Sequence, residues 1–230
     1  MPMDVLQTLR GGLVVSCQPV DDGPMDRPDI VAAMAAAAVA GGAAGLRIEG
    51  VENLAAARAA VRVPIIAILK RDLPDSPVRI TPFADDVRAL AAAGADIVAY
   101  DATDRIRPEP AADLVAAIRA SGRLAMADCA MLDDGRRALV DGASILGTTL
   151  SGYTEATAGR SDGVDLALIG AFRDLGAFVM AEGRVNTPDL AAQTIAAGAD
   201  AVTVGTALTR LEIMTDWFQK AVVDGVRRRE

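Results

Sequence analysis

Two ionisable side chains stand directly after apolar runs of the sequence. Lys70 ends the run Pro-Ile-Ile-Ala-Ile-Leu (64–69), and Glu182 follows Phe-Val-Met-Ala (178–181). Burial lowers the pKa of an inward-facing ammonium, and a lysine with a pKa of about 7 or 8 could act as a base near neutral pH. The residues alone leave two other readings open: a Lys70 that reaches solvent or forms a salt bridge, and a Glu182 that only pairs with Lys70 or Arg184.

Histidine is absent from the chain, and the two cysteines, Cys17 and Cys129, lie far apart in the sequence. Serine–histidine–aspartate catalysis, cysteine–histidine catalysis and histidine-ligated zinc are therefore excluded. Proton transfer near neutral pH is left to Lys, Asp, Glu, Cys or Tyr side chains. Hard cations held by carboxylates are the metal candidates that remain, although we assign no residue to a metal site. The lack of closely spaced cysteines favours a reducing, cytoplasmic location.

The composition narrows the classes of ligand. The 230 residues are 52% hydrophobic and carry a formal net charge of -8, which predicts a folded protein without a general attraction to nucleic acid or to anionic membranes. The apolar run at 13–17 follows Asp4, Gln7 and Arg10 and is too short for a secretion signal or a membrane span. A phosphate ligand would need a locally positive site.

Eight short apolar runs recur along the chain, and each is followed by an alanine-rich stretch of helical length. Their spacing is that of βα units, and continuous apolar runs are typical of parallel strands covered on both faces. The expected strands are 13–17, 46–48, 64–69, 97–100, 124–127, 144–146, 178–181 and 201–204. The expected helices are 28–40, 51–60, 85–93, 110–120, 134–140, 162–175, 188–197 and 208–226.

This alternation predicts an α/β fold, a single (β/α)8 TIM barrel with parallel strands that occupies residues 1–230 as one catalytic domain. Gly94, Gly142 and Gly198 fall where helices should end and fit left-handed C-caps. A doubly wound sheet is the main competing architecture, but Gln-Pro-Val (18–20) follows the first strand where that fold places a glycine-rich phosphate loop. Because no nucleotide-binding motif occurs elsewhere, we expect no nucleotide cofactor.

Polar residues follow the expected strands at the end of the barrel where active sites lie. Lys70 and Glu182 belong to the third and seventh strands, which lie opposite each other in an eight-stranded barrel. The two groups could therefore exchange a proton with two faces of one carbon. Gln18, Arg47 and Asp128 could hydrogen-bond sugar hydroxyls or an amide.

The ends of the seventh and eighth strands suit a phosphate group. Gly183, Gly205 and Thr206 could offer backbone N–H groups, as barrels often do at this position. Arg210, one turn into the last expected helix, could clamp a phosphate with two hydrogen bonds. The alternative is a solvated charge on the helix surface.

Together these segments resemble the N-acetylmannosamine-6-phosphate 2-epimerase family of amino-sugar and sialic acid breakdown. The resemblance runs in order through nearly the whole chain. The matching segments are 12–18, 46–48, 64–71, 80–82, 101–105, 126–128, 147–154, 181–184 and 204–210. One departure follows Asp128, where Cys-Ala-Met (129–131) stands at a place that the family more often fills with a small hydroxyl residue.

The resemblance implies inversion of C2 between N-acetylmannosamine 6-phosphate and N-acetylglucosamine 6-phosphate without an organic cofactor. It implies that Lys70 is the catalytic lysine and that Glu182 is the second acid or base. The positions that it assigns to the amino-sugar phosphate are Gln18, Arg47, Asp128, Gly183, Arg184, Gly205, Thr206 and Arg210. Because C2 of the open-chain sugar lies next to the C1 aldehyde, its proton is weakly acidic and an enolate can form.

Other interpretations of the barrel stay open. A lysine on a barrel strand can form a Schiff base, as in class I aldolases. A barrel without catalysis could bind a sugar phosphate as a sensor, whereas metal-dependent pentose-phosphate epimerases are disfavoured because the chain has no histidine. Trp217 and Phe218 on the last helix could form a homodimer surface, although packing against the barrel is the favoured expectation.

Overall fold

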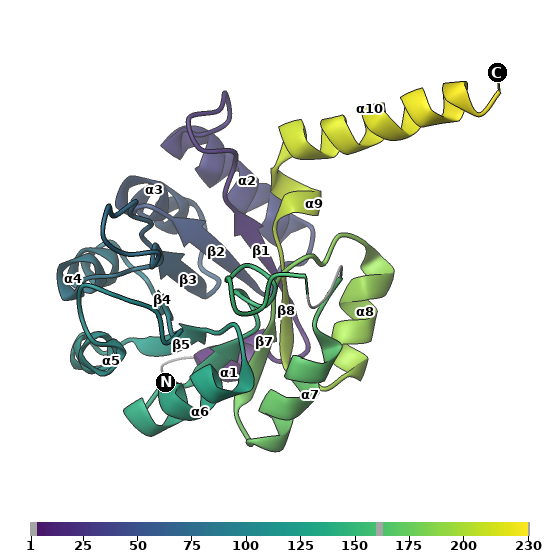
Figure 1. Cartoon of the computed structure of the whole chain (residues 1–230). Coiled ribbons are helices and arrows are strands. Elements are labelled where there is room, and N and C mark those ends of the chain that lie inside the picture. Colours follow the sequence, from purple (N-terminus) through teal and green to yellow (C-terminus); the bar gives the residue numbers. More distant parts are fainter. Residues whose placement is uncertain (1–3, 160–162, 230) are drawn as a thin grey trace.

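Eight parallel strands pair in chain order and close into a barrel, with β1 bonded to both β2 and β8 (Figure 1). The computed structural model describes residues 4–159 and 163–229. The strands are β1 (Leu13–Cys17), β2 (Gly45–Glu49), β3 (Ile65–Ile68), β4 (Ile97–Asp101), β5 (Leu124–Asp128), β6 (Ile145–Gly147), β7 (Phe178–Ala181) and β8 (Ala201–Val204). Each predicted strand is present within one residue at either end, which confirms the (β/α)8 barrel.

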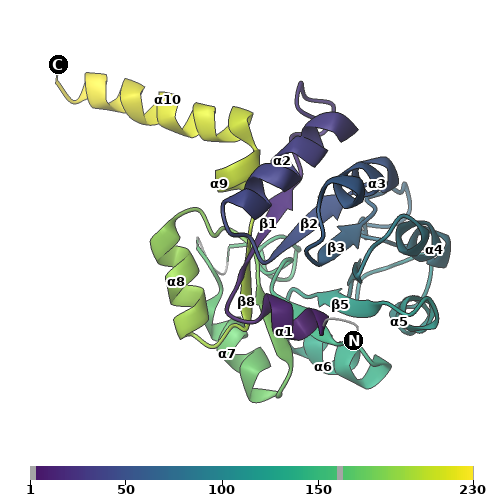
Figure 2. The ribbon, with the colours of Figure 1, turned by 180° about the vertical axis from the view of Figure 1, so that it is seen from behind.

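Helices α2 to α8 surround the barrel and alternate with the strands, and three further helices lie at the two ends of the chain (Figures 1 and 2). The helices of the described residues are α1 (Val5–Leu9), α2 (Pro28–Ala40), α3 (Val51–Ala60), α4 (Ala84–Ala92), α5 (Ala111–Ala120), α6 (Leu132–Asp141), α7 (Leu166–Asp174), α8 (Pro188–Ala196), α9 (Thr206–Thr209) and α10 (Leu211–Arg227). Gly94, Gly142 and Gly198 have φ values of 104°, 101° and 112°, so the predicted left-handed helix ends are confirmed.

The apolar core has two layers because successive side chains of a strand point to opposite faces. One layer fills the barrel and includes Val14, Ile66 and Met126. The other lies between the strands and the helices and includes Leu46 and Phe172. The strands are therefore buried on both faces, as their continuous apolar runs predict.

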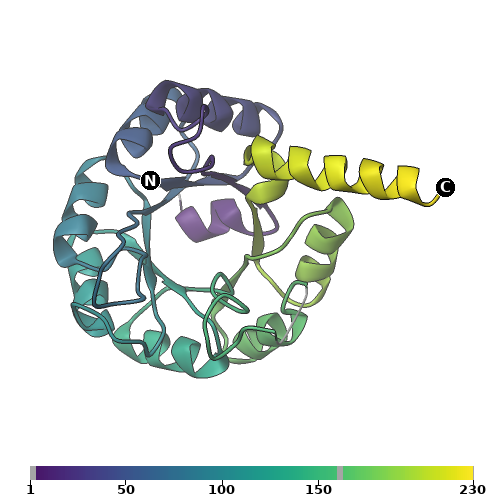
Figure 3. The ribbon, with the colours of Figure 1, turned by 45° about the horizontal axis from the view of Figure 1, so that its top comes forward.

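Helix α1 was not predicted from the sequence. Figure 3 shows it across one end of the barrel. This is the end where the strands begin, because α1 directly precedes β1, whereas Lys70 and Glu182 follow the carboxyl ends of β3 and β7. Its Leu9 is fully buried in the inner layer, with Val5 and Leu6 packed against that layer. Helix α1 thus closes the bottom of the barrel and leaves the other end open for a ligand.

Two predicted helices were wrong at their boundaries. The expected helix 162–175 begins at Leu166, because the Asp165 side chain accepts the backbone N–H of Leu168 and caps the helix there; residue 162 lies outside the described residues. The expected helix 208–226 is two helices, α9 and α10, separated at Arg210, whose φ of -107° and ψ of 77° are not helical.

Helix α10 extends away from the barrel (Figures 1 and 3). None of its residues is buried, and Trp217 and Phe218 are 41% and 68% exposed. The expectation that these two side chains pack against the barrel is therefore wrong. In the described part of the chain, no helix is long and apolar enough to cross a membrane.

Candidate active site

The carboxyl ends of the strands surround a cavity of about 680 Å³, a volume typical of small-molecule sites. Nine of the ten predicted site residues line it, namely Gln18, Arg47, Lys70, Glu182, Gly183, Arg184, Gly205, Thr206 and Arg210. The tenth, Asp128, lies behind Arg47 and holds it. The barrel therefore gathers residues that stand up to 192 positions apart in the chain, as in the Arg210–Gln18 hydrogen bond.

A buried ionic network forms the floor of this cavity. Arg47 at β2 donates from Nη2 to Asp128 Oδ2 at 2.6 Å and from Nη1 to Asp128 Oδ1 at 3.1 Å. The same Nη1 donates to Glu182 Oε2 at 3.0 Å, and Thr149 Oγ1 donates to Asp128 Oδ1 at 2.6 Å. Glu182 therefore pairs with Arg47, and not with Lys70 or Arg184 as the alternative interpretation had it. Removing one member would leave a buried charge without its partner, which typically costs about 3–5 kcal/mol.

Glu182 follows β7, and its backbone is fixed by a neighbouring hydroxyl. Thr148 Oγ1 accepts the Glu182 N–H at 3.0 Å and donates to the Glu182 carbonyl at 2.8 Å. The carboxyl is only 14% exposed, and this burial raises its pKa to about 7, with Asp128 adding to the rise and Arg47 opposing it. Near neutral pH this carboxyl can therefore both take and release a proton.

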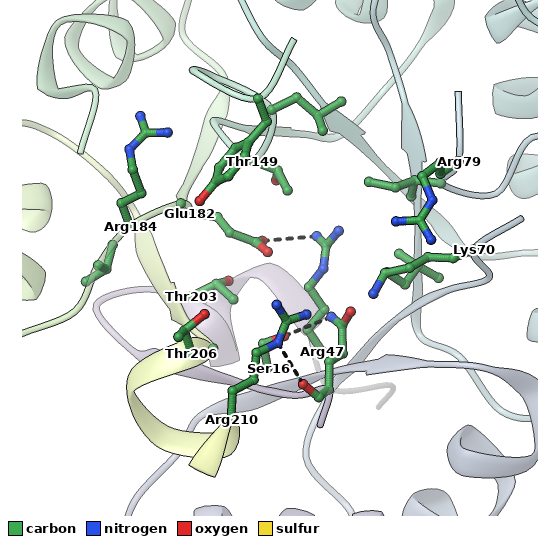
Figure 4. Close-up of a pocket in the computed structure, with 18 of the residues that line it drawn as sticks. Ser16, Arg47, Lys70, Arg79, Thr149, Glu182, Arg184, Thr203, Thr206 and Arg210 are labelled. Atoms are coloured by element: carbon green, nitrogen blue, oxygen red, sulfur yellow. Dashed lines mark hydrogen bonds and ion pairs between the residues drawn. The ribbon is translucent and has the colours of Figure 1, made fainter. Parts of the chain in front are cut away.

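Lys70 enters the cavity from the opposite side (Figure 4). Burial lowers the pKa of its amine, and the carboxylates of Asp21 and Glu49 only partly oppose this. No described residue forms a hydrogen bond or ion pair with the Lys70 amine. The salt-bridged reading of this lysine is therefore not the one that the structure supports, and an unpaired amine with a lowered pKa faces the cavity.

Arg210 occupies the break between α9 and α10 and points into the cavity (Figure 4). Its Nε donates to the Gln18 carbonyl at 3.1 Å, and the Gln18 side chain donates to Ser16 Oγ at 2.8 Å. Both terminal nitrogens of Arg210 are without a partner among the described residues. The break in the helix thus presents a guanidinium fork to a ligand, which a continuous helix would not do.

Glycine backbone lines the wall beside Arg210. Gly183 follows Glu182 with a φ of 105°, a left-handed value that favours glycine. Gly205 precedes α9, and a Cβ there would come within 3.3 Å of the Ser16 side chain. Thr206 begins α9 next to it. The two predicted glycine ends are therefore on one wall with Arg210, as a phosphate site requires.

Arg184 lines the outer part of the cavity and points away from Lys70 (Figure 4). It donates to the carbonyls of Ser151 and Gly163, both at 2.8 Å, and lies 5.1 Å from the centre of the Tyr153 ring. Its guanidinium thus holds the loop after β6, and its predicted contact with the substrate stays a prediction.

The cavity is locally positive although the chain is acidic. Six basic side chains line it, against the two carboxylates of Asp101 and Glu182. The lining also includes charged and aromatic side chains that the sequence did not place in the site, among them Arg79, Arg105 and Tyr153. Arg47, Arg79 and Arg105 are paired with carboxylates, and Arg184 is bonded to backbone carbonyls. Lys70 and Arg210 are therefore the cations whose terminal nitrogens are open to a ligand. Among the described residues, no three acidic or cysteine side chains gather as a metal site would require.

The departure after Asp128 lies outside the cavity. Cys129 is fully buried between strands and helices, and the backbone N–H groups of Ala130 and Met131 both donate to Asp134 Oδ2, at 2.9 and 3.0 Å. Asp134 thereby anchors the start of α6. The segment 129–131 therefore fixes a helix start rather than a ligand contact.

Comparison with known sequences gives consistent matches over nearly the whole chain. A family model described as putative N-acetylmannosamine-6-phosphate epimerase matches residues 31–224. A putative N-acetylmannosamine-6-phosphate 2-epimerase of Actinobacillus pleuropneumoniae serotype 5b is 58% identical over 94% of this chain and 93% of its own length. The protein of the same description from Proteus mirabilis is 55% identical over 96% of this chain and 94% of its own.

Solved structures give the same picture. The N-acetylmannosamine-6-phosphate 2-epimerase from Clostridium perfringens superposes with a TM-score of 0.92 at 38% identity, covering 96% of this chain and 97% of that one. A thiamine phosphate pyrophosphorylase from Pyrococcus furiosus superposes with a TM-score of 0.62 at 18% identity, covering 90% of each chain, and so shows only the shared barrel fold.

Proposed function

This chain belongs to the N-acetylmannosamine-6-phosphate epimerase family, and from that premise we propose that it inverts C2 of N-acetylmannosamine 6-phosphate to give N-acetylglucosamine 6-phosphate. The reaction belongs to the breakdown of amino sugars, including sialic acid. The observation that carries the proposal is the pair of unlike ionisable groups, Lys70 and Glu182, on facing walls of one cavity beside a cationic clamp.

The chemistry requires a base close to C2 and a stabilised enolate. We propose that the uncharged Lys70 amine removes the C2 proton of the open-chain sugar, because its lowered pKa raises the fraction of free base near neutral pH. The C2–H electrons then move toward C1, and the aldehyde oxygen becomes an oxyanion. The buried Arg47 guanidinium lines the cavity and supplies positive charge to that oxygen.

A proton returned to the other face of C2 completes the inversion. Glu182 stands on the opposite wall, and a pKa of about 7 leaves a large share of its carboxyl protonated at neutral pH. Either Glu182 delivers its own proton to C2, or it takes part in one relay that starts and ends at Lys70. Neither route needs an organic cofactor or a metal, so we classify the enzyme as a cofactor-independent isomerase.

The phosphate of the substrate is placed at the wall formed by Gly183, Gly205, Thr206 and Arg210. The two free terminal nitrogens of Arg210 can donate to two oxygens of a phosphate. The glycines have no side chain, so the phosphate can come close to their backbone N–H groups. Gln18 and the Arg47 guanidinium, which Asp128 holds from behind, remain for the sugar hydroxyls or the acetamido group.

Conversion of N-acetylmannosamine 6-phosphate by dialysed, chelator-treated enzyme tests the proposal. We expect the parent enzyme to convert the substrate. In Lys70→Ala, kcat should fall about a thousandfold, which is the order expected for removal of a general base. The matched control is Lys220→Ala, which removes an exposed lysine of α10. Near-normal turnover by Lys70→Ala would rule out the assigned base.

The same lysine allows a Schiff-base reaction, which a separate measurement excludes or supports. Borohydride traps an imine as a stable adduct. We expect no adduct at Lys70 in the presence of N-acetylmannosamine 6-phosphate, and no cleavage of a carbon–carbon bond. An adduct at Lys70 would favour an aldolase, and binding without any turnover at high enzyme concentration would favour a sensor.

We also propose that the chain forms a homodimer through α10 and that it works in the cytoplasm. Exposed apolar side chains gather on this helix, including Leu211, Phe218, Val222 and Val226 at 53–68% exposure. Trp217 on the same helix lines the cavity, so a second copy that covers α10 would also fix one edge of the site. Both cysteines are free and buried, which fits a reducing compartment.

A further inference from the structure

The chain leaves the barrel immediately after β3, and Lys70 belongs to a hairpin rather than to the parallel sheet. β3 pairs with β4 only as far as Ala67, which lies opposite Val98. Beyond that point Lys70 bridges to Ile80 in antiparallel fashion. The backbone groups of this segment therefore need hydrogen-bond partners outside the parallel ladder, because an unpaired backbone N–H away from water costs free energy.

Side chains from two other segments supply these partners. Glu49 Oε1 accepts the backbone N–H of Lys70 at 3.2 Å, and Thr81 Oγ1 accepts that of Leu69 at 3.3 Å. Thr81 also donates its own backbone N–H to the Leu69 carbonyl at 2.7 Å. The peptide unit that joins Leu69 to Lys70 is thus held at its carbonyl by Thr81 and at its N–H by Glu49.

Thr81 occupies a conformation that threonine rarely adopts. Its φ is 46°, in the left-handed region, and its side chain is fully buried. A non-glycine residue there costs about 1–3 kcal/mol and persists only where its surroundings require it. The requirement is visible here, because this backbone turns both the Thr81 N–H and its hydroxyl toward Leu69. The segment 80–82, which carries part of the family resemblance, therefore holds the backbone next to Lys70.

Glu49 acts from behind the lysine rather than from the cavity. It ends β2 opposite Ile68, and Asn53 donates to its carbonyl at 3.1 Å, so its backbone is fixed. It is not among the described residues that line the cavity, whereas Lys70 is. A substrate in the cavity therefore meets Lys70 and not the carboxylate that holds it.

Four charged groups act on the Lys70 amine. Asp21 lies on the loop after β1 and Glu49 at the end of β2, and both raise the pKa of Lys70. Arg47 of β2 and Arg210 between α9 and α10 lower it, and burial lowers it most. Loss of the Glu49 charge alone is therefore expected to lower the pKa of Lys70 further.

We propose that Glu49 and Thr81 are positioning residues for Lys70. They hold the backbone on both sides of the Leu69–Lys70 peptide bond, so that the Lys70 amine reaches the reacting carbon. The proposal rests on the proposed role of Lys70 as the base. Displacement of a reacting group by about 1 Å can cost about a hundredfold in rate, so a fixed root matters for turnover.

A titration that needs no turnover tests the part of Glu49. Lys70 and Lys220 are the only lysines in the chain, so ¹³C-labelled lysine gives two side-chain signals in the NMR spectrum. Glu49→Gln keeps an oxygen that can accept the Lys70 N–H but removes the charge. We expect the titration midpoint of Lys70 to fall by about half a pH unit or more, with that of Lys220, 71% exposed on α10, unchanged.

The control is Glu52→Gln, which makes the same change at an exposed position of α3. It should leave both midpoints in place. An unchanged Lys70 midpoint in Glu49→Gln would overturn the assignment of Glu49. The signals are read without substrate, so this result does not depend on the proposed reaction. If the proposed reaction is wrong, Lys70 still titrates, but the enzyme does not convert the substrate.

Two substitutions of Thr81 test the other contact through kinetics. Thr81→Val removes the hydroxyl at nearly constant shape, whereas Thr81→Ser keeps it. We expect Thr81→Val to lower kcat about tenfold with KM within about twofold of the parent value, and Thr81→Ser to retain most of kcat. Equal kcat values for the two variants would overturn the role of the hydroxyl. If Thr81→Val does not fold, Glu49→Ala must show the same fall in kcat at unchanged KM, or the proposal fails.

Discussion

A guanidinium held between two carboxylates is the organising feature of the site at the scale of residues. Arg47 is 1% exposed and touches both Asp128 and Glu182, so none of the three charges stands alone in the core. Lys70 faces this network without a partner of its own. The site therefore places a paired ionic floor opposite a free amine, and the two titrating groups face one cavity.

Burial of Glu182 makes a prediction about stability and pH. Its pKa rises from 4.5 to about 7 on folding, so the folded protein binds its proton more tightly than the unfolded chain does. This contribution to stability is present in full below pH 4.5 and is lost as the pH rises through about 7. Urea unfolding of the parent and of Glu182→Gln from pH 5 to pH 8 measures it.

We expect the difference in free energy of unfolding between Glu182→Gln and the parent to shift in favour of the glutamine as the pH rises, by about 3 kcal/mol at most. Glutamine does not titrate, so the shift reports on the carboxyl alone. The control is Glu52→Gln, whose difference from the parent should stay constant with pH. A constant difference for Glu182→Gln would contradict a raised pKa.

The phosphate clamp is tested by Arg210→Ala. Loss of charge-assisted hydrogen bonds worth about 2 kcal/mol should raise KM about thirtyfold for the phosphorylated sugar, with a smaller change in kcat. Turnover of unphosphorylated N-acetylmannosamine, if detectable, should not fall. Arg136→Ala, at an exposed arginine of α6, is the matched control. A normal KM for Arg210→Ala would move the phosphate away from this wall.

At the scale of elements, the helices around the barrel pack closely where glycine allows it. A Cβ on Gly135 of α6 would come within 2.5 Å of the Phe172 ring on α7, whereas a Cβ on Gly170 of α7 would meet nothing within 4 Å. The two glycines therefore predict opposite effects of the same substitution.

We expect Gly135→Ala to destabilise the protein by about 1–3 kcal/mol through overpacking. Gly170→Ala should stabilise it by about 0.5–1 kcal/mol, because alanine is the better helix former and the site is open. Chemical denaturation of both variants gives the two values. Equal effects of the two substitutions would show that α6 and α7 do not pack as described.

The sequence predicted the elements well because their signals are local. Apolar runs and left-handed glycines marked the strands and helix ends, and the barrel then placed nine predicted site residues around one cavity. The break at Arg210 and the hydrogen bond from the Lys70 N–H to the Glu49 carboxylate were not predicted. Both depend on contacts between distant segments, which leave no periodic pattern in the chain.

At the scale of the whole molecule, charge is distributed unevenly. The chain carries a net charge of -8, while the open end of the barrel gathers basic side chains around the cavity. A phosphorylated sugar is therefore repelled by much of the surface and attracted to one end. The closed end, plugged by α1, leaves the substrate a single entrance.

The exposed face of α10 predicts how copies of the chain assemble. Substituting Phe218 and Val222 by aspartate places two charges on this face and should shift the protein from dimer to monomer in sedimentation velocity. Val140→Asp, at an 88% exposed apolar residue of α6, should leave the dimer intact. A parent protein that sediments as a monomer at micromolar concentration would contradict the proposed assembly.

Proton exchange at C2 tests the central claim most directly. Proton NMR of N-acetylmannosamine 6-phosphate in deuterated buffer, with metal-free enzyme, follows substrate, product and label together. We predict N-acetylglucosamine 6-phosphate that carries deuterium at C2, and neither product nor exchange with Lys70→Ala. Product that forms without any deuterium at C2 during many turnovers, or a Lys70→Ala variant that exchanges C2 as fast as the parent, would contradict the account.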